Sequence, residues 1–281
     1  MGNRLSLAAI CASVAVLFSA EVAAVPVTFE SGGSDAASIQ LTVDAFRTSL
    51  GTLNPNVAGS FGSGRREINW DGVPDAFAAP NNLPANFFNV NSPRGVVFST
   101  PGVGVQVSAN AINPAGAPIE FGNIDPSYPG LFRTFSPQRL FTSIGSNVVD
   151  VNFFVPGTST AALTNGFGAV FTDVDLPNTT SIEFFDVANL SLGTFFAPTG
   201  TTANESLSFL GVDFDEYVIS RVRITNGNAS LGAGILESAD VDLVVMDDFI
   251  YGEPIAAVPE PAVLTLLGLG LLGLGMTRRK S

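Results

Sequence analysis

The feature that most constrains this fold is a series of short, β-rich segments in which apolar and polar residues alternate. In the segment RVRIT, for example, Val222 and Ile224 alternate with two arginines. Successive side chains of a strand point to opposite faces, so each segment has one apolar and one polar face. Antiparallel sheets with one face on a core and the other in water have this pattern. We expect strands at 25–30, 94–100, 103–109, 148–155, 167–172, 181–186, 193–196, 206–209, 217–225 and 240–251.

Turn-forming Gly, Pro, Asn and Asp separate these segments at short intervals, as in all-β sandwiches and barrels. We therefore predict an all-β fold, an antiparallel β-sandwich of jelly-roll or lectin-like type with one short helix. The 23 phenylalanines of the chain suit a single core. No Pro/Ser/Gly linker divides the middle of the chain, so residues 25–253 are expected to form one domain.

The helix is expected over Ser34–Leu50, where apolar residues recur every three or four positions. Part of this stretch also alternates as a strand would, but Ser34 as an N-cap and Gly51 as a stop favour the helix. Residues 54–93 are rich in Asn, Pro and Gly and also contain several aromatics. We expect them to form a long ordered loop.

Residues 1–24 have the composition of a secretory signal peptide. Arg4 supplies the positive start, residues 5–18 form an apolar helix, and Val22-Ala23-Ala24 offers small residues to signal peptidase. Cleavage after Ala24 would remove Cys11, the single cysteine of the chain. The exported protein would then contain no disulfide and no thiolate metal ligand.

The C-terminal segment 258–281 has three parts. Pro259-Glu260-Pro261 is followed by an uncharged run to Met276 that is mostly Leu and Gly, and then by a basic cluster, Arg278, Arg279 and Lys280. The apolar run is expected to form a transmembrane helix, although it is shorter than the ~20 residues that usually span a bilayer. The basic end favours the cytoplasmic side, so the rest of the chain would face outward. Residues 254–257 would be a spacer.

These three parts, in this order, resemble the PEP-CTERM sorting signal of exported proteins in Gram-negative bacteria that make exopolysaccharide. The resemblance implies export across the inner membrane, transient anchoring there by the C-terminal helix, and processing near Pro259-Glu260-Pro261 by an exosortase. The product would reach the cell surface or the extracellular matrix. An ordinary C-terminal anchor is the alternative. Segments such as SPRGVVFST and DDFIYGEP resemble the exported part of other PEP-CTERM proteins, a resemblance that transfers no activity.

Composition excludes several functions. The chain has no histidine, so Ser-His-Asp and Cys-His mechanisms and the usual zinc sites are ruled out. Without its two ends it holds eight basic and 23 acidic residues, a net charge of −15. An acidic surface repels nucleic acid, because phosphate binding needs Lys and Arg. Its carboxylates could instead attract divalent cations.

The carboxylates nominate a candidate calcium site. Asp173 and Asp175 lie two residues apart, Glu30 ends the first expected strand, and Asp247-Asp248 lies near the end of the last. VTFE and MDDFIY resemble lectin-like sandwiches in which the first and last strands are neighbours and hold Ca²⁺. Oxygen ligands without His or Cys suit this ion. The alternative is that these carboxylates only solvate the surface and cap turns.

Asn69-Trp70-Asp71 nominates a candidate carbohydrate site. An exposed Trp70 could stack on a sugar ring while Asn69 and Asp71 bind its hydroxyls. The alternative, which we favour, is a core tryptophan with its N–H group satisfied. No motif nominates a catalytic pair of carboxylates for glycoside hydrolysis.

Together these observations predict an exported, exosortase-sorted protein of the cell surface or matrix. Its β-sandwich is expected to make carbohydrate or protein contacts without catalysis, with exopolysaccharide as a candidate partner. A calcium-dependent carbohydrate-binding module and a secreted polysaccharide hydrolase are the alternatives.

Overall fold

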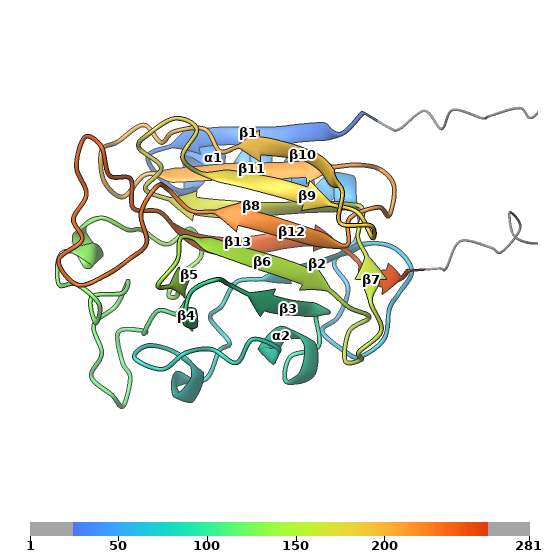
Figure 1. The fold of residues 1–281 in the computed structure, drawn as a ribbon, viewed down its shortest axis with the longest axis horizontal. Coiled ribbons are helices and arrows are strands. Elements are labelled where there is room, and N and C mark those ends of the chain that lie inside the picture. The colour runs from blue at the N-terminus through green and yellow to red at the C-terminus, as the bar shows by residue number, and fades with distance from the viewer. Residues whose placement is uncertain (1–24, 258–281) are drawn as a thin grey trace, which may run out of the picture.

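Two antiparallel β-sheets stack face to face, with one helix, α1, on the outer side of the larger sheet (Figure 1). This computed structural model describes residues 25–257. The predicted all-β sandwich is confirmed. The expected signal helix at 1–24 and the expected hydrophobic helix at 258–281 lie outside the described residues. Within them, no helix combines the length and apolar character needed to cross a bilayer.

The larger sheet has seven strands in the order β1-β11-β8-β13-β5-β4, with β2 also paired to β13. All of its pairs are antiparallel. Its strands are β1 (Val27–Gly33), β2 (Arg65–Ile68), β4 (Gly104–Val107), β5 (Phe141–Ile144), β8 (Gly166–Thr172), β11 (Leu207–Asp213) and β13 (Val245–Gly252).

The smaller sheet has five strands in the order β10-β9-β12-β6-β3. They are β3 (Val96–Ser99), β6 (Val148–Phe153), β9 (Ser181–Phe185), β10 (Ser191–Phe196) and β12 (Arg221–Thr225). A further pair joins β7 (Ala162–Leu163) to β14 (Ile255–Ala256). Residues 254–257, expected to be a spacer, therefore contain a paired strand of the folded part.

The main core lies between the two sheets. Phe98, Val151 and Phe184 of the smaller sheet pack in one buried cluster with Phe167 and Phe249 of the larger. Each of these side chains is at most 2% exposed. Burial of a side chain of this size contributes about 1.5–3 kcal/mol, which makes this interface the principal source of stability.

Helix α1 (Ala36–Leu50) covers the outer face of the larger sheet with the predicted apolar stripe. Its N-cap is Asp35 rather than the expected Ser34, because Asp35 and Ser38 form a reciprocal capping box. Phe46 enters the sheet at two glycines. A Cβ at Gly168 or Gly211 would lie 2.8 or 2.9 Å from its ring, so larger residues there would displace the helix.

The expected neighbourhood of the first and last strands is wrong, because β11 and β8 lie between β1 and β13. The expected loop at 54–93 is ordered but contains β2, the 3₁₀ turn η1 (Asp75–Phe77) and the one-turn helix α2 (Phe87–Val90). A second 3₁₀ turn, η2 (Tyr128–Gly130), lies in the long connection from β4 to β5. β2 and β5 are not expected from the sequence, because each has only four residues. β2 pairs with β13, and β5 pairs mainly with β4.

Candidate binding groove and buried carboxylate cluster

A β-bulge in β13 places Asp247 and Asp248 together. Met246 pairs with Phe171 of β8 and Phe249 pairs with Ala169, so two residues of β13 oppose one of β8. Neighbouring strand residues normally point to opposite faces, but at a bulge the alternation breaks. On its other edge β13 changes partner here, from β5 at Met246 to β2 at Phe249. The bulge and the change of partner open the sheet at one point.

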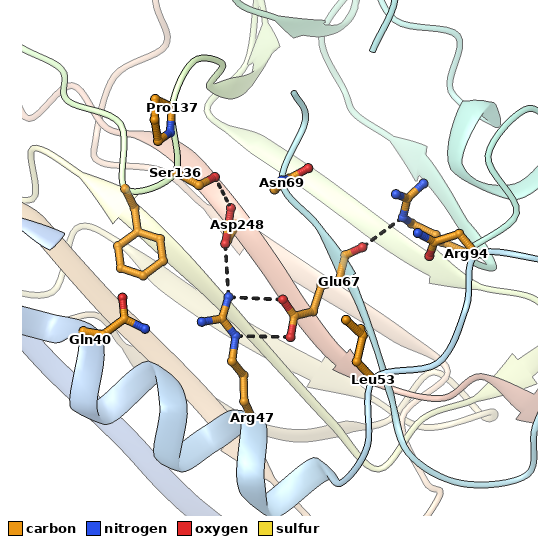
Figure 2. Close-up of a pocket in the computed structure, with 11 residues that line it drawn as sticks. Gln40, Arg47, Leu53, Glu67, Asn69, Arg94, Ser136, Pro137 and Asp248 are labelled. Carbon is orange, nitrogen blue, oxygen red and sulfur yellow. Dashed lines mark hydrogen bonds and ion pairs between the residues drawn. The ribbon is translucent and has the colours of Figure 1, made fainter. Parts of the chain in front are cut away.

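A groove of about 500 Å³ lies over this point, beside α1 (Figure 2). Its lining comes from segments far apart in the sequence: α1, the residues around β2, the loop before β5, and β13. Most of the lining side chains are polar or charged. They are Gln40, Arg47, Asn56, Glu67, Asn69, Arg94, Ser136 and Asp248, with Leu53, Phe135 and Pro137 supplying apolar surface.

An ion-pair network crosses the floor of the groove (Figure 2). Arg47 Nε and Nη2 each donate to a carboxylate oxygen of Glu67 at 3.1 Å, and Nη2 also reaches Asp248 Oδ2 at 3.4 Å. Ser136 Oγ donates to Asp248 Oδ1 at 2.6 Å. Arg65 Nε donates to Glu67 Oε1 at 2.7 Å. Both carboxylates of the groove are therefore already engaged.

Burial shapes the charge of this network. Burial of Asp248 raises its pKa, although its hydrogen bonds with Ser136 and Asp247 and the charge of Arg47 oppose the change. Burial beside Asp248 raises the pKa of Asp247 far more. Burial alone would lower the pKa of Arg47, but its contacts with Glu67, Asp44 and Asp248 together outweigh this effect and raise it. The groove floor is a compact set of compensated charges.

Arg94 differs from the other arginines of the groove region. Its Nε donates to the backbone oxygen of Glu67 at 2.9 Å and its Nη1 donates to Ser92 Oγ. Its guanidinium lies 5.2 Å above the ring of Phe88. Burial lowers the pKa of Arg94. Tyr251 opposes this change, and the charge of the nearby Arg66 adds to it.

The three residues of the candidate carbohydrate site have different surroundings. Trp70 is 1% exposed, lies flat on Phe141 with ring centroids 4.1 Å apart, and donates from Nε1 to the backbone oxygen of Asp247 at 2.8 Å. Its ring is therefore closed to a sugar, and Trp70 is a core tryptophan with its N–H group satisfied, which is the alternative that we favour from the sequence. Asp71 accepts from the backbone N–H groups of Gln138 and Arg139 at 2.6 and 3.2 Å. Asn69 alone is exposed and lines the groove.

A second cluster lies away from the groove, where Asp173 and Asp175 meet Glu237 and Asp242. Asp173 is fully buried, and neither of its carboxylate oxygens, nor either of Glu237's, has a hydrogen-bond partner within residues 25–257. Asp242, in contrast, accepts from the backbone N–H of Asp175 at 3.0 Å and from Thr179 Oγ1.

Burial raises the pKa of Asp173 to about 10, and the adjacent carboxylate of Glu237 adds to the effect. Burial also raises the pKa of Glu237 to about 7, and the adjacent carboxyl group of Asp173 opposes this change. The two carboxyls can thus share one proton, which supplies the donor that the four oxygens lack. Among the described residues, no three acidic side chains are arranged to hold a metal ion.

The candidate calcium ligands do not converge on one site. Asp173 and Asp175 lie in the carboxylate cluster, and Asp247 and Asp248 lie at the bulge. Glu30 is exposed on β1, separated from β13 by two strands. Glu30 and Asp248 could bind one ion only if β1 lay beside β13. The strand order instead places β11 and β8 between these two strands.

Several residues of both sites carry no signal in the sequence. Arg47, Glu67, Arg94 and Ser136 come from four separate segments, and the tertiary fold alone brings them to one groove. Glu237 follows no strand pattern and meets Asp173 only because its loop packs against the end of β8. No local motif could have nominated these residues.

Comparison with known protein families identifies a PEP-CTERM protein-sorting motif at residues 257–280. This range contains Pro259-Glu260-Pro261, the apolar run and the basic cluster, so the predicted sorting signal is confirmed. Comparisons with curated proteins and with solved structures gave no significant match. The match covers the C-terminal segment alone, and it says nothing about what the β-sandwich binds.

Proposed function

Because the chain carries a PEP-CTERM motif, it is an exosortase-sorted, exported surface protein, and we propose that its β-sandwich binds a saccharide without catalysis. The motif concerns transport only. The binding role is assigned to the groove over the bulge of β13, beside α1.

The lining of this groove is the observation that supports the proposal. Gln40, Asn56, Asn69 and Ser136 offer amide and hydroxyl groups that can bind sugar hydroxyls, and Phe135 offers a half-buried ring to the apolar side of a sugar. Sites for small ligands combine such apolar surface with a few fixed polar groups. The volume of about 500 Å³ is within the usual size of these sites.

The state of the two groove carboxylates supports a role without catalysis. Glycoside hydrolysis needs one carboxyl group as acid and a second as base or nucleophile. Glu67 is held by Arg47 and Arg65, and Asp248 by Arg47 and Ser136. Both carboxylates already have hydrogen-bond partners within the chain. A secreted polysaccharide hydrolase is the competing proposal.

A glycan array with the purified full-length chain in mild detergent tests the binding proposal, followed by calorimetry on the best ligand. Asn69→Ala should weaken binding about fivefold or more, since one neutral hydrogen bond is worth roughly 1 kcal/mol. Asn81→Ala is the matched control, because Asn81 is exposed outside the groove. Equal affinity in both variants, or no bound glycan, would overturn the proposal.

The same ligand tests catalysis. New reducing ends should not accumulate when the protein is incubated with a bound polysaccharide. Turnover that is lost in Glu67→Gln or Asp248→Asn would establish the hydrolase instead.

A further inference from the structure

Arg94 is the exception among the eight arginines of residues 25–257. Seven have a carboxylate oxygen within 4.0 Å: Arg47, Arg65, Arg66, Arg133, Arg139, Arg221 and Arg223. Within the same residues, Arg94 has none. In a part of the chain with 23 acidic and eight basic residues, an arginine without a carboxylate is unusual.

The contacts of Arg94 fix its guanidinium on the groove wall and leave one side of it available. Nε and Nη1 are held by Glu67 and Ser92, and the ring of Phe88 supports the plane from one face. Nη2 has no acceptor in the described part of the chain. Figure 2 shows Arg94 on the far side of Glu67 from Arg47, so the ion-pair network does not neutralise it.

Local charge repels an anion less here than on the rest of the protein. The four arginines around the groove and β2 (Arg47, Arg65, Arg66 and Arg94) face four carboxylates (Asp44, Glu67, Asp248 and Glu253), and a fifth carboxyl group, Asp247, is buried beside Asp248 with a raised pKa. The region therefore carries little net charge, whereas residues 25–257 carry −15. A half-buried cation without a counter-ion gains most from an anionic partner that excludes water from it.

We propose that the groove recognises an anionic saccharide, a uronic acid residue in a polysaccharide, and that Arg94 binds its carboxylate. This inference rests on the proposed function of the groove and names its ligand class. The planar guanidinium matches the two oxygens of a carboxylate, which lysine would bind only as a point charge. Asn69, beside Arg94 in the groove, is placed for the sugar hydroxyls.

Three probes separate the contribution of the carboxylate from those of the sugar hydroxyls and of negative charge in general. They are an oligogalacturonate, the same oligomer with its carboxyl groups reduced to alcohols, and a sulfated dextran. Calorimetry is done with the full-length chain in mild detergent. The oligogalacturonate should bind about tenfold to a hundredfold more tightly than the reduced oligomer, the range expected for a charge-assisted hydrogen bond. Arg94→Gln should remove this difference, and Arg94→Lys should restore part of it.

Arg223→Gln is the matched control, because Arg223 lies on the smaller sheet and Asp150, its partner, retains Arg221. Melting temperatures show whether each variant folds. If Arg94→Gln does not fold, the affinity of Arg94→Lys is compared with that of the wild-type chain instead.

Equal affinity for the acidic and reduced oligomers, with Asn69→Ala weakening both, would overturn this inference and leave the proposed function intact. Absence of binding in every arm would overturn both. Equally tight, Arg94-dependent binding of sulfated dextran would overturn the choice of a carboxylate.

Discussion

Arg66 and Glu253 form an ion pair in which both side chains are fully buried. Arg66 Nε and Nη2 donate to the two carboxylate oxygens of Glu253 at 2.6 and 2.8 Å. The other donors of Arg66 reach the backbone oxygens of Val57, Gly59 and Pro93. All five N–H groups are satisfied, so this one side chain connects β2, the end of β13 and the long 54–93 region.

Glu253→Gln should lower the free energy of unfolding by about 3–5 kcal/mol, because it leaves the charge of Arg66 buried without a partner. Urea denaturation measures the change. Glu205→Gln is the control, since the Arg133–Glu205 pair is 39% and 46% exposed and should contribute less than ~1 kcal/mol. Similar losses in the two variants would show that burial of the Arg66–Glu253 pair has no energetic consequence.

Trp70→Phe should cost roughly 1–3 kcal/mol, because it removes the Nε1 hydrogen bond to Asp247 and part of a stacked ring in the core. Trp70 is the single tryptophan, so fluorescence of the wild-type chain reports on this site alone. We expect blue-shifted emission in the folded state and no quenching by a bound saccharide. Emission typical of water, or strong quenching by a sugar, would contradict burial.

The Asp173–Glu237 pair should make the protein less stable as pH rises. The folded-state pKa values, about 10 and about 7, lie above the ordinary values of 3.8 and 4.5. At pH values between the ordinary pKa and the folded-state pKa of each group, the folded state holds protons that the unfolded chain has released. The free energy of unfolding therefore falls with increasing pH. Asp173→Asn should flatten this slope between about pH 5 and 8. Asp215→Asn, at an exposed aspartate, is the control; an unchanged slope in Asp173→Asn would contradict the shared proton.

Calcium provides a separate test of the same cluster. Because no three acidic residues of the described part are arranged to hold a metal ion, we expect the proton, rather than a cation, to satisfy Asp173 and Glu237. The melting temperature should then be the same in calcium and in chelator. A ligand that binds only the folded state would raise it. A rise that Asp173→Asn abolishes would restore the calcium-dependent alternative at Asp173, Asp175, Glu237 and Asp242.

Changes in the sorting motif should stop processing without affecting the sandwich. Replacing Pro259 and Pro261 by alanine and Glu260 by glutamine should leave the precursor in the inner membrane, because the PEP-CTERM resemblance assigns recognition to these three residues, which lie within the matched range. Intact-mass measurement of membrane and surface fractions shows whether the C-terminal segment has been removed. Thr265→Ser, in the apolar run, should be processed normally. Normal processing of the triple variant would contradict a role for the three residues.

Strand and helix prediction succeeded where the signal was local. The RVRIT segment became β12 with its arginines on the more exposed face, and the stripe from Ile39 to Leu50 became the buried side of α1. Prediction failed for β2, whose four residues include two arginines and a glutamate. Its place in the sheet depends on β13 and on the burial of Arg66, neither of which is visible in the RREI segment.

The sequence by itself determined the class of fold, the apolar faces of its strands, and the PEP-CTERM signal, because each is written in residues that lie close together along the chain. Only the tertiary structure decided the strand order, which separates Glu30 from Asp248. It also decided that Trp70 is buried, that Arg94 lines a groove without a carboxylate partner among the described residues, and that Asp173 meets Glu237. These relationships join residues from distant segments, so no local pattern of residues could reveal them. The groove depends in addition on how β13 bulges and changes its partner.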